Sequence, residues 1–329
     1  MSKCWKIAII VISSILALIL IFLGVYYLWP WNKSFFNMAS EEFLIPGLDT
    51  KFTPQGMSLI DGSDKFLICG YMTDNTPSRI YVINNGKIEK YFTLTQSEED
   101  YVGHAGGIVS FGSTIWIVGD KHCYRFSLSD VNRIQNGGKV AILDSFKTNN
   151  GADFVFTSNN FLWVGEFYKK DKYETDASHR LQTRSGETNN AVVFGYKIDE
   201  SKGYGLVSQA PLPDKALSIR DLAQGIAVAS DGKFVMSTSY GLPDSNIYVY
   251  KNVLSEEKHG TIAIGMHNVD LWYLDNHALE QTINAPSMSE EIVIKNDRVY
   301  VLFESGAKKY RVFNRKQLKY VYSFALNNI

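Results

Sequence analysis

The sequence predicts an all-β fold, a single β-propeller preceded by one N-terminal transmembrane helix. Two observations support this prediction: a hairpin pattern that recurs along most of the chain, and an uncharged apolar run near the N-terminus. The recurring unit is clearest at residues 223–241, AQGIAVASDGKFVMSTSYG, where an apolar strand, an Asp231-Gly232 turn and a second strand follow one another. Because glycine accepts the positive φ that tight turns need, this pattern predicts a β-hairpin.

The hairpin returns four more times, at residues 54–71, 103–120, 151–167 and 289–305. Each copy has a short inner strand, a turn built from Gly, Asn, Asp or Ser, and a strand of aromatic or β-branched residues. A recurrence of about 50 to 70 residues is typical of a propeller, whose four-stranded blades bury their faces against one another. Five blades are therefore visible.

Two segments bear on the number of blades and on ring closure. Residues 269–275 and 279–285 look like a further strand pair, which is either an insertion in the fourth blade or the remnant of a sixth blade. Residues 41–48, EEFLIPGL, are expected to supply a strand that closes the ring against the C-terminal strand. Closure of this kind removes the exposed edges that invite aggregation.

Residues 7–28 are apolar or small and carry no charge. At about 1.5 Å per residue this run spans the hydrocarbon layer, whereas the core of a cleavable signal peptide, the alternative, is shorter. Lys3 and Lys6 precede the run and favour a cytoplasmic N-terminus, although Lys33 beyond it weakens the asymmetry. The expected parts are a cytoplasmic tip (1–6), a transmembrane anchor (7–28), a linker with a possible closing strand (29–52) and an extracytoplasmic propeller (53–329).

The composition excludes some functions and leaves one question open. The formal net charge is -1, which gives no electrostatic argument for nucleic-acid binding. Cys69 and Cys123 fall in neighbouring repeats, where they either pair in an oxidising compartment or stay as two buried thiols.

The polar insertion at residues 169–190 is expected to be a mobile surface loop, with its His179 solvated.

The repeat also predicts where a site would lie. In a propeller the first strand of each blade lines the axial channel. The turn that enters this strand and the end of the second strand open on the same face, so polar residues at these two points should converge. The entry positions hold Gln55, His104, Asp153, Gln224 and Glu290 with Glu291, and the ends of the second strands hold Tyr71, Asp120, Glu166, Tyr240 and Glu304.

One histidine and up to six carboxylates around one opening repel one another unless they are protonated, hydrogen-bonded or neutralised by a cation. Calcium is the natural neutraliser, because it accepts several carboxylate and amide oxygens in flexible geometry. In the alternative without a ligand site, these side chains cap turns or pair with Arg220, Lys308 or Lys309. The candidates are Glu290, Asp153, Glu304 and Asp120 as metal ligands, His104 and Glu166 as catalytic residues, and Gln55, Gln224, Tyr71 and Tyr240 as ligand contacts.

These residues leave two functions open, because no GxSxG elbow, phosphate-binding glycine loop, HExxH or Cys-x-x-Cys pair is present. The first is a membrane-anchored module that binds a surface polymer, a protein or a small molecule through the mouth of the propeller. The second is a calcium-dependent hydrolase of lactone or ester type, with His104 as general base.

The segments PQGMSLIDG, AQGIAVASDG and SEEIVIKND resemble the strand entries and turns of the calcium-dependent, six-bladed propellers of the gluconolactonase and strictosidine-synthase-like group, and more loosely NHL repeats. The resemblance covers most of residues 54–326 as a pattern. It implies a metal in the channel, with Glu290 in the place of the acidic residue that opens an inner strand and Asp153 in the place of a ligand from another blade. Gln55 and Gln224 stand where a carboxylate would be expected, which weakens both the metal site and the hydrolase activity.

Overall fold

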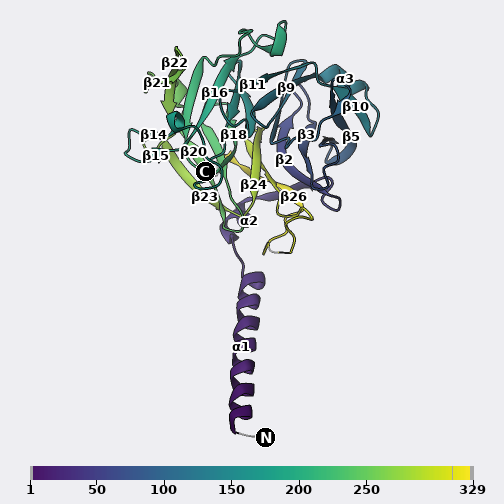
Figure 1. The fold of residues 1–329 in the computed structure, drawn as a ribbon, viewed down its shortest axis with the longest axis vertical. Coiled ribbons are helices and arrows are strands. Elements are labelled where there is room, and N and C mark those ends of the chain that lie inside the picture. The colour runs from purple at the N-terminus through teal and green to yellow at the C-terminus, as the bar shows by residue number, and fades with distance from the viewer. Residues whose placement is uncertain (1–2, 313, 327–329) are drawn as a thin grey trace.

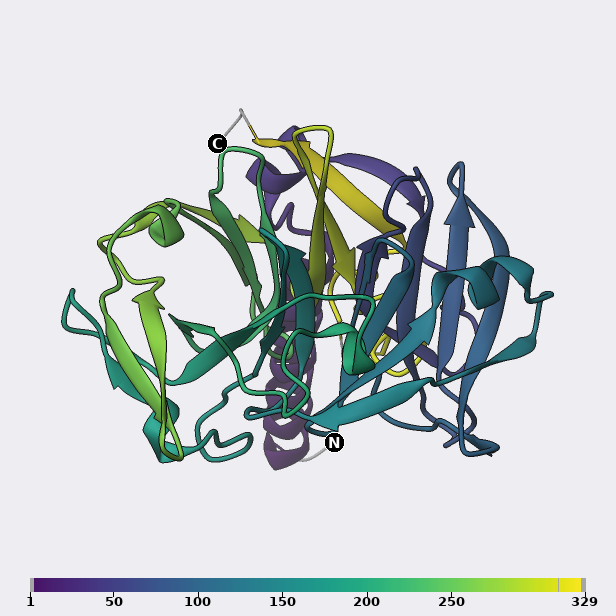
Figure 2. The ribbon, with the colours of Figure 1, turned by 90° about the horizontal axis from the view of Figure 1, so that it is seen from above.

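The computed structural model describes residues 3–312 and 314–326. It begins with a long apolar helix, α1 (Lys3–Leu28), which contains no buried residue. A short helix, α2 (Lys33–Met38), follows and buries Phe35 against the aromatic rings of Phe303, Tyr322 and Phe324, with ring centroids 6.0 to 6.2 Å apart. Helix α1 is long and apolar enough to cross a membrane or to act as a signal anchor. It extends away from the remainder of the chain near α2, β23 and β26 (Figure 1), and a view along it shows it behind the blades (Figure 2).

The remaining chain forms a five-bladed β-propeller, and the predicted fold class is confirmed. The blades follow one another in chain order, from blue through green to yellow (Figure 1). Each blade begins at the axis with the first strand of a predicted hairpin. These five apolar strands contact one another around the axis, each lying between the first strands of the two adjacent blades. The innermost strands are β2 (Phe52–Leu59), β7 (Gly107–Phe111), β12 (Phe154–Ser158), β18 (Ala223–Val228) and β24 (Ser289–Lys295).

Outside each innermost strand lie three further antiparallel strands. The second strands are β3 (Phe66–Met72), β8 (Thr114–Gly119), β13 (Phe161–Gly165), β19 (Phe234–Thr238) and β25 (Arg298–Phe303). The third strands are β4 (Arg79–Asn84), β9 (His122–Ser127), β16 (Ala191–Lys197), β20 (Ser245–Tyr250) and β26 (Tyr320–Ala325). The outer strands are β5 (Lys87–Gln96), β11 (Asp144–Lys147), β17 (Lys215–Ile219), β23 (Leu279–Ala285) and β1 (Ser40–Leu44).

The ring closes between the two ends of the chain, as the sequence predicts. Strand β1 pairs antiparallel with β26, so that blade 5 contains three C-terminal strands and one N-terminal strand. Phe43 of β1 is buried and its ring lies 5.0 Å from that of Phe66 in blade 1. Closure therefore joins blade 5 to blade 1 through backbone pairing and through packing.

The possible sixth blade is instead an insertion. Strands β21 (Gly260–Ile264) and β22 (His267–Tyr273) form a hairpin, and β22 pairs in parallel with β17, which extends blade 3 to six strands. The expected pairing of residues 269–275 with 279–285 is wrong, because β23 pairs with β20 in blade 4. Sequence periodicity does not report such a crossover to a neighbouring blade.

The remaining elements lie outside the five four-stranded blades. Strand β10 (Gly138–Ala141) pairs in parallel with β5 of blade 1, and β6 (Glu99–Asp100) also pairs with β5. The others are α3 (Leu128–Arg133), the 3-10 turns η1 (Ala177–His179), η2 (Gly203–Gly205) and η3 (Val253–Ser255), and the hairpin of β14 (Leu181–Gln182) with β15 (Thr188–Asn189).

The two buried cysteines are free thiols, so the alternative of separate thiols holds. Burial raises the pKa of Cys123 well above its ordinary value, and burial likewise raises that of Cys69. Cys69 donates to the carbonyl of Ala105 at 3.2 Å. Both side chains therefore act as small core residues.

Candidate functional site

A cavity of about 440 Å³ opens at one end of the propeller axis, and side chains from all five blades line it. Its size lies within the usual range for a small-ligand site. The structure thus brings together eight of the residues that the sequence assigns to the mouth. These are Gln55, His104, Asp153, Gln224 and Glu290 from the strand entries, and Tyr71, Tyr240 and Glu304 from the ends of the second strands.

Three of these side chains reach the cavity because β-bulges interrupt their strands. The pairing register shifts around Gln55 in β2, around Gln224 in β18, and around Glu290 with Glu291 in β24. A bulge places an extra residue out of the ladder and re-aims its side chain. Adjacent side chains point in different directions at such a bulge. Glu290 lines the mouth cavity, whereas Glu291 lines a separate cavity of about 190 Å³ in the channel.

His104 and Asp153 are positioned differently, before their strands begin. Ala105 and Ala152, next to them in the chain, have φ values of 53° and 57°, in the left-handed region that alanine rarely adopts. Leu222 and Met288 have φ values of 66° and 63° at the corresponding entries of blades 4 and 5. Four of the five entries therefore carry backbone strain, which is characteristic of functional sites.

Glycines let the inner strands approach closely below the cavity. A Cβ on Gly56 would lie 2.7 Å from the Cα of Gly107, and one on Gly225 would overlap the Glu291 carboxyl group. Glu291 is 1% exposed and burial raises its pKa well above the ordinary value, although backbone N–H groups of Ile292, Val155 and Ile226 oppose this effect. Burial therefore disfavours the charged form of the Glu291 carboxyl group on the axis.

The floor of the mouth cavity is a pair of hydrogen-bonded carboxyl groups, Glu290 and Glu304. Burial, and then the charge of Glu304, raise the pKa of Glu290 well above its ordinary value. Burial also raises the pKa of Glu304, to about 7, while its hydrogen bonds with Glu290 and Gln55 oppose the shift. Gln55 Nε2 donates to Glu304 Oε2 at 3.0 Å. The two groups therefore titrate as a pair, and burial favours their protonated forms.

Asp153 adds a third carboxyl group to this cavity. Burial raises its pKa to about 7, and the nearby charges of Glu166 and Asp120 act in the same direction. The backbone N–H of Phe167 donates to Asp153 Oδ2 at 2.7 Å and opposes the shift. Near pH 7 this group therefore changes its charge with small changes in its surroundings.

The His104 ring stacks on Tyr71, with centroids 4.9 Å apart and planes 23° from parallel. The side chain is open to the cavity, yet surrounding protein atoms desolvate it and lower its pKa, which Asp120 partly offsets. Within the described residues no hydrogen bond to either ring nitrogen is present. The neutral imidazole is therefore free to donate to and accept from a ligand.

Two lysines stand on the rim in matching ways. Lys309 Nζ donates to the Tyr71 hydroxyl and Lys172 Nζ donates to the Tyr240 hydroxyl, each at 2.6 Å. The two ammonium groups also lie 5.0 and 5.3 Å from the centroids of these rings. Lys172, Tyr173 and Tyr310 were missed by the sequence analysis, because they belong to loops outside the repeated hairpins, and Lys309 was named there only as an ion-pair partner of the mouth residues.

Asp120 and Glu166 lie in a neighbouring cavity of about 820 Å³, which shares His104, Asp153, Phe167 and Tyr173 with the mouth cavity. The Glu166 carboxylate is 2% exposed and fully engaged. It accepts from the backbone of Val192 at 3.0 Å and of Gly151 at 3.2 Å, and its Oε1 lies 2.8 Å from His179 Nδ1. A positioning role fits Glu166 better than contact with a ligand.

The prediction that His179 is solvated is wrong. His179 is 7% exposed, because the insertion at residues 169–190 folds into η1 and the β14–β15 hairpin and brings the ring onto Glu166. The adjacent Arg180 does remain on the surface, where it pairs with Glu174. A polar segment gives no periodic signal that would distinguish one buried histidine.

The four predicted metal ligands do not form a metal site. Across residues 3–312 and 314–326, no group of three or more His, Cys, Asp and Glu side chains is arranged to hold an ion. Glu290 and Glu304 bond to each other, and Asp120 lies in the neighbouring cavity. The residues present therefore do not fit the calcium site that the resemblance implies.

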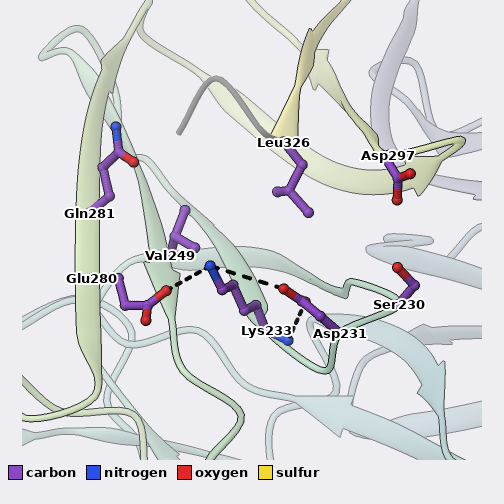
Figure 3. Close-up of a pocket in the computed structure, with 8 residues that line it drawn as sticks. All are labelled: Ser230, Asp231, Lys233, Val249, Glu280, Gln281, Asp297 and Leu326. Carbon is purple, nitrogen blue, oxygen red and sulfur yellow. Dashed lines mark hydrogen bonds and ion pairs between the residues drawn. The ribbon is translucent and has the colours of Figure 1, made fainter.

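A further cavity, of about 540 Å³, lies between blades 4 and 5 around the Asp231-Gly232 turn and is lined by none of the mouth residues. Figure 3 shows Lys233 between Asp231 and Glu280, at N–O distances of 4.0 and 3.0 Å. Lys233 and Glu280 are already paired with each other, and side chains of only two blades line this cavity, so the mouth cavity is the stronger candidate.

No family model matches the sequence, and no curated protein matches it. Three solved structures are similar in arrangement. The PQQ-bound aldose sugar dehydrogenase of Streptomyces coelicolor is 10% identical, with 87% of this chain and 97% of that chain covered and a TM-score of 0.45. The glutaminyl cyclase of Myxococcus xanthus is 8% identical, with coverages of 87% and 94% and a TM-score of 0.44. A luciferin-regenerating enzyme is 11% identical, with coverages of 88% and 95% and a TM-score of 0.42. The propeller assignment rests on the sheet order of this chain, and these names do not bear on its ligand.

Proposed function

We propose that this protein is a membrane-anchored β-propeller whose mouth cavity binds a small polar ligand that carries an ammonium group. The observation that supports this proposal is the meeting of Glu290, Glu304 and Asp153 in one cavity walled by tyrosines. Buried carboxyl groups are stabilised by a cation, and aromatic faces attract ammonium groups. The anchor is α1, with the N-terminus in the cytoplasm and the propeller outside.

The charge distribution specifies the ligand further. The carboxyl groups lie on the floor, whereas Lys309 and Lys172 stand at the rim. A zwitterion matches this arrangement, because its ammonium group would meet the floor and its carboxylate would meet the rim. The amide groups of Gln55 and Gln224 can form hydrogen bonds that orient the part of the ligand between its ammonium group and its carboxylate. Free α-amino acids have this chemistry.

The account predicts proton release on binding. Burial favours the protonated form of Glu290 in the ligand-free cavity, whereas an ammonium group beside it favours the carboxylate. Calorimetric titration of the full chain in lipid nanodiscs, with a panel of α-amino acids in two buffers of different ionisation enthalpy, measures this release. The corresponding α-hydroxy acids, which lack the amine, are the control ligands.

Glu290→Gln with Glu304→Gln should abolish both the binding and the proton release, because it removes the floor charge. Glu280→Gln is the matched control, since Glu280 lies in the cavity between blades 4 and 5 and not in the mouth. Equal binding of the hydroxy acids, or binding without proton release, would contradict the proposed recognition.

A calcium-dependent lactonase or esterase is the second candidate. The raised pKa values of the floor carboxyl groups favour it, because a divalent cation would also stabilise their charged forms. The lack of a three-ligand group among the described residues disfavours it. Addition of a chelator tests it: this function requires a lower melting temperature and loss of lactone hydrolysis, and neither effect follows from amine binding.

A further inference from the structure

The segment that joins β25 to β26 carries a cluster of cationic side chains. We call residues 308–312 and 314–319 the basic loop. It contains six lysines and arginines and no aspartate or glutamate. Lys308 and Lys319 are exposed and form no ion pair with any described residue. The cationic side chains are Lys308, Lys309, Arg311, Arg315, Lys316 and Lys319.

The basic loop contacts the end of the membrane helix. The hydroxyl of Tyr27, in the last turn of α1, donates to the carbonyl of Val312 at 3.5 Å. The Arg315 guanidinium lies 4.5 Å from the centroid of the Trp31 ring, just after α1. Figure 1 shows the yellow segment below β26 descending on the side from which α1 leaves.

These contacts fix the depth of the basic loop relative to a bilayer. Helix α1 has 26 residues, a length of about 39 Å at 1.5 Å per residue. The hydrocarbon layer is about 30 Å thick, so the last turn of α1 emerges among the lipid headgroups. Val312 lies beside that turn and is 72% exposed, which places an apolar side chain at the membrane interface.

We propose that the basic loop binds the anionic phospholipid headgroups of the bilayer that α1 spans. The inference rests on the membrane anchoring proposed above. Two cations are already neutralised, since Arg311 pairs with Asp49 at 2.7 Å and Arg315 pairs with Asp244. Lys308 and Lys319 are available to lipid phosphates, and such contacts weaken as salt is added.

Headgroup binding would also act on the mouth cavity. Lys309 and Tyr310 belong to the basic loop and line that cavity, and Lys309 donates to Tyr71 on its rim. A loop held by lipid therefore holds one wall of the site in place.

Hydrogen–deuterium exchange of the full chain in nanodiscs tests this inference. Nanodiscs of phosphatidylcholine alone are compared with nanodiscs that also contain phosphatidylglycerol. We expect the amides of the basic loop to exchange several-fold more slowly with phosphatidylglycerol present, and added salt to remove the difference. Lys308→Glu with Lys319→Glu should also remove it, whereas Lys87→Glu with Lys251→Glu, exposed lysines of blades 1 and 4, should not.

Equal exchange of the basic loop in the two lipids would overturn the inference while leaving the anchor intact. Slower exchange only on addition of polyglutamate would assign the loop to an acidic protein partner and would also overturn it. Failure of the anchoring has a separate signature, because the amides of α1 would then exchange freely in both lipids.

Discussion

Replacement of Glu304 by glutamine should reduce the pH dependence of the free energy of unfolding. The ordinary pKa of a glutamate in the unfolded chain is 4.5, and burial raises that of Glu304 to about 7 in the folded protein. Between these values the folded state binds more protons than the unfolded state, so the free energy of unfolding falls as pH rises. A separation of about 2.5 pH units corresponds to a loss of about 3 kcal/mol. The Glu304→Gln variant lacks this loss.

The assay is urea unfolding of the full chain in detergent micelles, followed by tryptophan fluorescence at several values between pH 4.5 and pH 7.5. The wild type should lose stability across this range, and Glu304→Gln should lose about 3 kcal/mol less. Glu98→Gln, at an exposed position in blade 1, is the control and should keep the wild-type slope. An identical slope in Glu304→Gln would refute the burial argument.

Two further substitutions test the packing that positions the site, each by urea unfolding. A Cβ on Gly107 would lie 2.8 Å from the backbone nitrogen of Val155, so Gly107→Ala should cost about 1–3 kcal/mol, whereas Gly260→Ala, with only an atom at 4.0 Å nearby, should be nearly neutral. His179→Ala removes a partner of the buried Glu166 carboxylate and should cost about 1–3 kcal/mol; an unchanged unfolding midpoint would show that this contact does not stabilise the fold.

The convergence of Gln55, Gln224 and Glu290 could be predicted from the sequence because it follows from the repeat. Each hairpin places the same position at the same end of the axis, whatever the separation along the chain. The sequence could not specify that bulges aim these side chains into the cavity. It left open whether the carboxyl groups of Glu290 and Glu304 would be protonated, hydrogen-bonded or neutralised by a cation.

The residues that the loops and insertions bring to the cavities could not be predicted from the repeat. Lys172 and Lys309 reach the cavity from loops with no counterpart in the other repeats. His179 is buried by an insertion whose polar composition suggests solvation. Strand β22 joins blade 3 although it lies within the chain of blade 4, because long-range strand pairing is decided by packing rather than by local pattern.

The protonation of the Glu290–Glu304 pair provides the most direct test of the proposed site. Infrared difference spectroscopy of the full chain near neutral pH detects the carbonyl stretch of a protonated carboxyl group. We expect this band in the wild type, a weaker band in Glu290→Gln, in which Glu291 still contributes, and a frequency shift in Gln55→Ala, because Gln55 donates to Glu304. A spectrum that is identical in the wild type and in Glu290→Gln would contradict the meeting of these side chains at the mouth of the propeller.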